Sequence, residues 1–181
     1  MKTLSYLRRL ADETRGAEIA EAAAVLPLMF LMLLGIFWFG QAFSIYGAIT
    51  RAAQDGARAG SLPFCATCNG DNTLSAYAAN AVNTVQNDLL ASRLDPSLAQ
   101  WPASHAALNA CGTDPKDCDT SSLKVCVQSP IQLTNSGPST TGLCGISVSL
   151  SYPYRFWLPF TSINKQTILI TASSRARLET R

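Results

Sequence analysis

Apolar residues are concentrated in one segment near the N-terminus of this 181-residue chain. No charged residue occurs between Ala22 and Thr50, and the densest part, residues 22–40, holds 19 residues. At 1.5 Å per residue, a helix of that length measures about 28 Å, close to the roughly 30 Å thickness of a bilayer's hydrocarbon core. The pattern predicts a membrane-spanning helix. Pro27 lies inside it, and because membrane helices tolerate proline by local rearrangement, we expect a kink there rather than a break.

The helical pattern continues beyond the apolar segment, where small residues recur every four positions at Ala48, Ala52, Gly56 and Gly60. Positions four apart lie on one face of a helix, and small side chains there allow another backbone to approach closely. Two interpretations stay open. This face rests on the chain's own domain, or it packs against neighbouring subunits.

Two further kinds of element follow. Apolar residues at three- and four-residue spacing between positions 73 and 94 predict an amphipathic helix that ends near Asp95 and Pro96. After an irregular stretch, alternation with period two in residues 121–128, 144–152 and 166–179 predicts three half-buried strands. The serines of the second strand would form its polar face: Ser147, Ser149 and Ser151.

The order of these elements predicts an α+β fold. A long N-terminal transmembrane helix extends into a small extracytoplasmic domain that contains a second helix and a short antiparallel sheet. The third strand ends in Arg175 and Arg177, which we expect to be solvated.

Charge adds an orientation to this picture. Four basic residues precede the apolar segment, and they are Lys2, Arg8, Arg9 and Arg15. Because positive residues favour the cytoplasmic side of a membrane, we expect the N-terminus in the cytoplasm. The net charge is only +2 and no polybasic run is present, so we expect no nucleic-acid partner.

All six cysteines follow the apolar segment, at Cys65, Cys68, Cys111, Cys118, Cys126 and Cys144. An even number on one side of a membrane segment indicates a disulfide framework in an exported domain. Buried free thiols are the alternative, and the spacing of Cys65 and Cys68 also fits a redox dithiol or half of a zinc site. Among the possible pairings we expect the sequential one, which joins Cys65 to Cys68, Cys111 to Cys118 and Cys126 to Cys144.

Catalytic chemistry has little support in the sequence. The one histidine, His105, lies in a predicted loop, and a hydrolytic triad would depend on it alone. No phosphate-binding glycine loop, acid dyad or HExxH motif is present. We therefore expect no enzyme, no cofactor, no bound metal and no small-molecule substrate.

Several segments resemble the TadE-like family, which comprises minor pseudopilins of the tight-adherence (Tad/Flp) branch of type IV pilus systems. The family has a short basic leader ending in glycine, then four residues, a glutamate and an apolar segment with an early proline. Gly16, Glu21 and Pro27 fit this pattern, as does "AAQDGAR" at residues 52–58. The segments "VSLSYPYRFWLPF" and "ITASSRARLE" also resemble the family's closing strands. Ala22 departs from the pattern, since a larger residue often follows the glutamate.

The resemblance implies that an inner-membrane prepilin peptidase cuts after Gly16 and frees the amine of Ala17. The domain organisation would then be a cytoplasmic leader (1–16), a transmembrane and stalk helix (17–60) and an extracytoplasmic pilin-like domain (61–181).

A carboxylate near the bilayer core costs roughly 2.5 to 3.5 kcal/mol, and a nearby positive charge recovers part of that free energy. Glu21 could therefore pair with the Ala17 amine of an adjacent subunit and set the axial register. The alternative is that Glu21 only complements the positive end of the helix dipole. Glu18 has no role in the resemblance.

Two functions from different classes follow. The first is a structural subunit of a Tad-type pilus or secretion pseudopilus in the bacterial inner membrane, with the peptidase and other pilins or pseudopilins as partners and its C-terminal domain periplasmic or extracellular. The alternative is a membrane-anchored or secreted envelope protein whose disulfide-bonded domain binds a ligand or partner.

Overall fold

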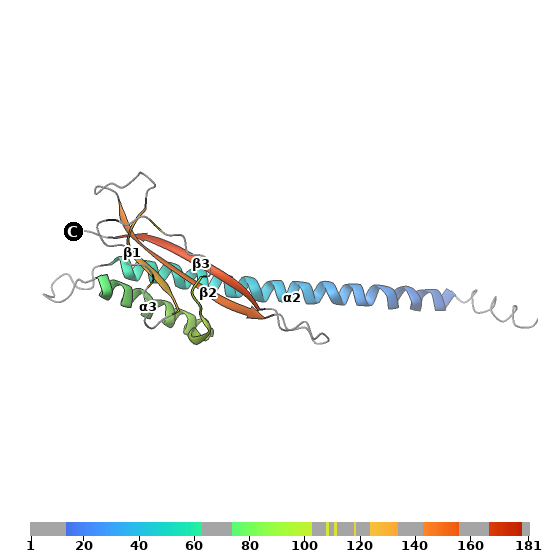
Figure 1. Ribbon diagram of the computed structural model, residues 1–181. Helices are drawn as coiled ribbons and strands as arrows, with labels where there is room; N and C mark the ends of the chain where they lie inside the picture. Colours follow the sequence, from blue (N-terminus) through green and yellow to red (C-terminus); the bar gives the residue numbers. More distant parts are fainter. Residues whose placement is uncertain are drawn as a thin grey trace, which may run out of the picture. The chain divides into compact units, whose positions relative to one another are not determined.

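A computed structural model describes residues 14–62, 74–102, 108, 111, 118, 124–133, 143–155 and 167–178. The elements, in chain order, are helix α2 (Thr14–Ser61), helix α3 (Leu74–Ala91), the 3-10 helix η1 (Pro96–Leu98) and strands β1 (Cys126–Gln132), β2 (Cys144–Arg155) and β3 (Thr167–Arg177) (Figure 1). The predicted α+β class is confirmed: a long apolar N-terminal helix, a second helix and a disulfide-bonded antiparallel sheet.

The chain divides into two compact units, Met1–Ala42 and Phe43–Arg181. In the first unit, α2 continues through Pro27 without a break, and the described side chains from Glu18 to Leu33 are all exposed. Within the described residues, this one helix is long and apolar enough to cross a membrane.

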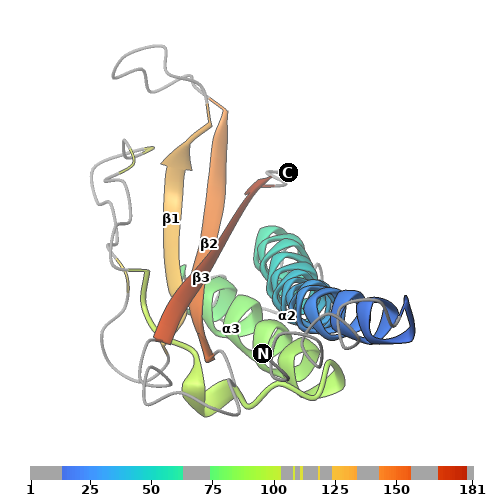
Figure 2. The ribbon, with the colours of Figure 1, turned by 90° about the vertical axis from the view of Figure 1, so that its right-hand side faces the viewer.

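The second unit packs two helices against one face of the sheet. Its strand order is β1-β2-β3, with both pairs antiparallel. Figure 2 shows the Phe43–Ser61 part of α2 beside α3, and the two run in opposite directions. The buried core joins side chains from both helices and from the central strand: Ile49, Ala52, Ala53, Ala57, Ala81, Val85, Leu89, Ile146, Val148 and Leu150.

Helix α3 ends at Ala91, before the predicted end near Asp95 and Pro96. Arg93 adopts a φ of 58°, a left-handed conformation that cannot continue a right-handed helix. Its N–H donates to the Leu90 carbonyl (2.9 Å), and the Leu94 N–H donates to the Leu89 carbonyl (2.8 Å). This hydrogen-bond pair is a Schellman motif, which is usually built on glycine. Because arginine occupies the position here, little in the sequence marks the end of α3.

Strand β1 also differs from its predicted range, because it begins at Cys126 and extends to Gln132 through Pro130. The register with β2 shifts between Gln128 and Ile131. Proline removes a backbone donor, but edge strands and bulges tolerate that loss, and β1 is an edge of the sheet.

The prediction of a half-buried β2 is wrong for its serine face. Ser147, Ser149 and Ser151 are all buried, with Ser151 fully inaccessible. β2 is the central strand, and Ser151 Oγ lies 2.7 Å from Thr171 Oγ1 on β3. The Ser151 backbone also exchanges two hydrogen bonds with Gln100. Alternation cannot tell a small hydroxyl paired inside a domain from one in water.

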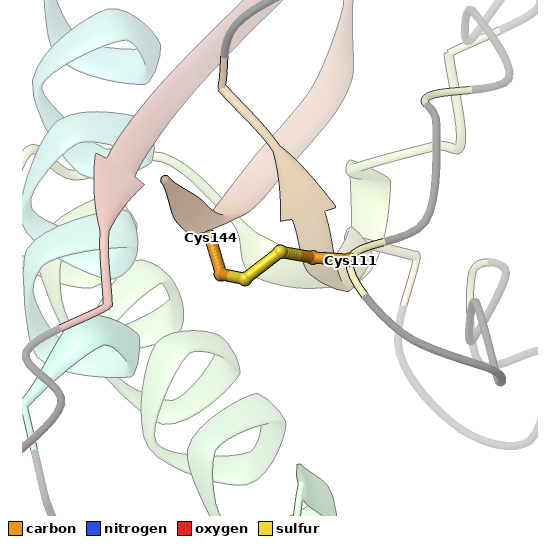
Figure 3. Close-up of a disulfide and its surroundings, with 2 residues drawn as sticks. All are labelled: Cys111 and Cys144. Atoms are coloured by element: carbon orange, nitrogen blue, oxygen red, sulfur yellow. A yellow bond between two sulfur atoms is a disulfide. The ribbon is translucent and has the colours of Figure 1, made fainter. Parts of the chain in front are cut away.

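The sequential disulfide pairing is wrong for Cys111, Cys118, Cys126 and Cys144. The structure joins Cys111 to Cys144 (Figure 3), with Cα atoms 5.6 Å apart, and Cys118 to Cys126, at 4.6 Å. In the β1–β2 pair, Cys126 lies opposite Ser149 and Cys144 opposite Gln132.

This register gives the physical reason for the correction. Ser149 lies five positions after Cys144 on β2, so Cys126 and Cys144 lie about 17 Å apart along the strands. This is well beyond the roughly 7 Å Cα separation that a disulfide can bridge. Cys111 lies at the Cys144 end of the β1–β2 pair, where its N–H donates to the Pro130 carbonyl at 3.1 Å. Cys65 and Cys68 lie outside the described residues.

Candidate functional site

The predicted processing site lies at the beginning of α2. The helix starts at Thr14, so the bond between Gly16 and Ala17 falls in its first turn. A side chain built on Gly16 would have no neighbour within 4 Å. The first N–H groups of a helix have no partner within the helix, so this turn is held by fewer hydrogen bonds than the middle of α2.

Glu18 and Glu21 are both exposed on the helix that follows. Glu21 lies four positions after Ala17, and residues four apart occupy the same face of a helix. The rise over four residues is about 6 Å. If cleavage occurs after Gly16, a carboxylate therefore stands one turn from the new amine, on the same side of the helix.

The stripe of small residues lies in the second unit, where Ala48 is half-buried and Ala52, Gly56 and Gly60 are buried. A Cβ placed on Gly56 would lie 2.5 Å from Val85 Cγ2 on α3. This contact favours the interpretation in which the stripe rests on the chain's own domain.

The sequence analysis did not identify one feature of the second unit, which is an acidic pair formed by Asp55 on α2 and Asp88 on α3. Burial raises the pKa of the Asp88 carboxyl on α3, with a further increase from Asp55 on α2 and an opposing effect from Arg51. Arg51 Nε lies 3.7 Å from Asp55 Oδ2, while Asp88 Oδ2 is buried without a hydrogen-bond partner. Asp88 follows Val85 by three positions on the apolar stripe of α3, and that spacing is the signal that could have identified it.

Other candidate chemistry finds no support in the described part of the chain. Those residues include no group of three or more His, Cys, Asp or Glu side chains able to hold a metal ion. His105 and the Cys65–Cys68 pair lie outside the described residues. The four described cysteines are all in disulfides, where a thiolate ligand is not available.

The helical segment just described carries the comparison with known proteins. The family model for TadE-like protein matches residues 16–58. The suspected resemblance to the TadE-like family is confirmed. The TadE-like match begins at Gly16, includes Glu21 and Pro27, and ends at Arg58 of "AAQDGAR". The expected likeness of the closing strands lies beyond it and stays a prediction. No curated protein and no solved structure matches the chain.

The TadE-like match suggests a Tad pilus-related protein, and the TadE-like family is of a structural kind. Together with the candidate membrane helix and the domain that follows it, the match fits a single-pass membrane protein of a pilus system.

Proposed function

We propose that the chain is a minor pseudopilin of a Tad-type pilus or related secretion pseudopilus. A prepilin peptidase removes the leader after Gly16, and the N-terminal part of α2 then joins the subunit to other pilins or pseudopilins. The TadE-like match over residues 16–58, which begins at the proposed cleavage site, carries this proposal.

The surface of α2 supports assembly through the helix. In the first unit its large apolar side chains are exposed, among them Leu28, Phe30 and Met32. Because water is a poor solvent for a helix that is apolar all round, either lipid or neighbouring subunits must cover it. One surface can thus serve both a membrane-bound state and an assembled state.

The disulfides support an exported second unit. Cys111–Cys144 and Cys118–Cys126 both belong to Phe43–Arg181, and structural disulfides persist outside the cytosol. With basic residues ahead of the apolar segment, the N-terminus remains cytoplasmic and the domain lies in the periplasm or outside the cell.

Glu21 has a specific role in this proposal. Cleavage places the Ala17 ammonium at the positive end of the α2 dipole, where a cation is unfavourable. The Glu21 carboxylate is unfavourable in the bilayer core by roughly 2.5 to 3.5 kcal/mol. Pairing the carboxylate with the Ala17 amine of an adjacent subunit relieves both costs and fixes the axial offset between subunits.

The test compares Glu21→Gln with Glu18→Gln, since both acids are exposed and lie within one turn of α2. We expect Glu21→Gln to be processed and to reach the membrane normally, but to lose crosslinks to other pilins, because it leaves the partner's ammonium without a counter-charge. Glu18→Gln should crosslink like the unmodified chain. Equal crosslinking of all three chains would leave Glu21 with only its helix-dipole role.

A further inference from the structure

One end of the second unit exposes large apolar side chains. On α2, Phe43 is 70% exposed and Tyr46 is 49% exposed, while on β3 Ile168 and Leu169 are 48% and 42% exposed. We call these four residues the apolar end.

Packing inside the second unit places Phe43 and Tyr46 of α2 at the same end of the unit as Ile168 and Leu169 of β3. Gly56 of α2 meets Val85 of α3 and Val148 of β2. Four residues farther along β2, the Tyr152 hydroxyl accepts a hydrogen bond from the Asp95 N–H at 3.1 Å, beyond the end of α3. Figure 1 shows that α3 and β2 both run antiparallel to α2. β2 therefore advances from the level of Gly56 toward the Phe43 end of the helix.

Strand β3 begins where β2 finishes. Ile168 pairs with Tyr154, and Leu169 pairs with Pro153. Alternate residues of a strand point to opposite faces, so Ile168 shares a face with the core residue Ala172, and Leu169 lies on the other face. At this end, each face of β3 therefore carries an exposed apolar side chain.

The exposure changes character within a few residues along the same strand. Thr171, Ser173, Arg175 and Arg177 are also exposed and lie on the same face as Leu169, but all four are polar. The exposed apolar surface of β3 is thus confined to its beginning. If water covered this face along its whole length, no such change from apolar to polar residues would be needed.

The sequence of α2 indicates what covers the apolar end. Phe43 follows the last residue of the dense apolar segment, Gly40, by three positions, and Tyr46 follows it by six. The polar layer on each side of a bilayer is roughly 5 to 8 Å thick. The helical rise places Phe43 about 4.5 Å beyond Gly40, within that layer, and Tyr46 about 9 Å beyond it, at the outer edge of the layer. Aromatic residues are enriched at this level of membrane proteins.

We propose that the apolar end rests in the headgroup layer of the same bilayer that α2 crosses, so that Ile168 and Leu169 form a second contact with lipid. This inference requires α2 to span the membrane and does not depend on pilus assembly. It gives the second unit a fixed orientation on the membrane before the subunit leaves for the pilus, since a domain held at two points cannot rotate freely about its helix.

The test uses the full chain in native membranes, with the photoreactive amino acid p-benzoylphenylalanine at single positions. The probe replaces Ile168 or Leu169, and the control replaces Ser173, which is exposed on the same strand and on the same face as Leu169. A second control replaces Met32 in the apolar segment of α2. Mass spectrometry after illumination detects lipid adducts.

We expect lipid adducts from positions 168, 169 and 32, and none from position 173. Adducts at 32 alone would overturn the inference while leaving the membrane span intact. Adducts from 168 and 169 to a second copy of the chain, without lipid, would overturn it in favour of a protein interface. An absence of lipid adducts at all positions would overturn both the span and the inference.

Discussion

Gly56 on α2 lies directly against Val85 on α3, and a Cβ added to Gly56 would stand 2.5 Å from Val85 Cγ2 and 3.1 Å from the Ala81 carbonyl oxygen. Real Cβ atoms do not approach other atoms as closely as the first distance. The contact therefore holds the two helices of the second unit at a separation that only glycine permits.

Replacing Gly56 should destabilise the second unit. Overpacking a core costs about 1–3 kcal/mol, whereas alanine gains about 0.5–1 kcal/mol over glycine inside a helix. For Gly56→Ala we expect a net loss of about 1 kcal/mol in the free energy of unfolding, and a larger loss for Gly56→Val. Chemical denaturation of the full chain in detergent micelles measures it.

Gly47→Ala is the matched control on the same helix. A Cβ at Gly47 would meet nothing within 4 Å, so only the helix propensity changes and stability should rise by about 0.5–1 kcal/mol. Equal shifts for the two substitutions would contradict the close contact between α2 and α3.

The disulfides make a second prediction. Non-reducing peptide mapping should recover Cys111 linked to Cys144 and Cys118 linked to Cys126. The sequence separations are 33 and 8 residues, for which the chain-entropy model gives about 4 and about 2.5 kcal/mol. Replacing Cys111 and Cys144 together by alanine should therefore lower the unfolding free energy more than replacing Cys118 and Cys126. Recovery of Cys126 linked to Cys144 would contradict the β1–β2 register.

Stability should depend on pH through Asp88. Burial raises the pKa of this carboxyl above its ordinary value of 3.8, so the folded state binds the proton more tightly than the unfolded state, and stability falls as pH rises from 3.8 through the folded pKa. At neutral pH, Asp88→Asn should be more stable than the unmodified chain, and this advantage should vanish as pH falls toward 3.8. Thermal melts across this range measure the difference.

Asp95→Asn should behave in the opposite way. Hydrogen bonds from Ser97 lower the pKa of the Asp95 carboxyl below 3.8, so its stabilising contribution is present above 3.8 and is lost as pH falls through the lower, folded value. Asp95→Asn should therefore be less stable than the unmodified chain at neutral pH. The same pH response in both variants would contradict the opposite pKa shifts of Asp88 and Asp95.

The sequence predicted the elements because their signals are local. The apolar run of α2, the helical spacing of α3 and the alternation of three strands each depend on neighbouring residues, and the fold class followed from their order. The features that were missed depend on tertiary contacts. Arg93 ends α3 in a conformation normally left to glycine. The serine face of β2 is buried, and Ser151 pairs there with Thr171 of β3.

The same distinction between local sequence signals and tertiary contacts applies to the candidate site. Gly16 and Glu21 could be proposed from the sequence because a processing motif is a linear pattern, and the TadE-like match includes both. The disulfide pairing could not be deduced, because it follows from the register that places Cys144 opposite Gln132. Asp88 was missed because its environment comes from Asp55 on another helix.

The mature N-terminus tests the central claim most directly. Intact mass and N-terminal sequencing of the protein from native membranes should give Ala17 as the first residue, and Gly16→Ala should leave the leader attached, because a peptidase that requires the bare glycine backbone cannot cut it. A mature chain that begins after residue 40 would have lost Glu21 and the apolar part of α2, and would contradict the account.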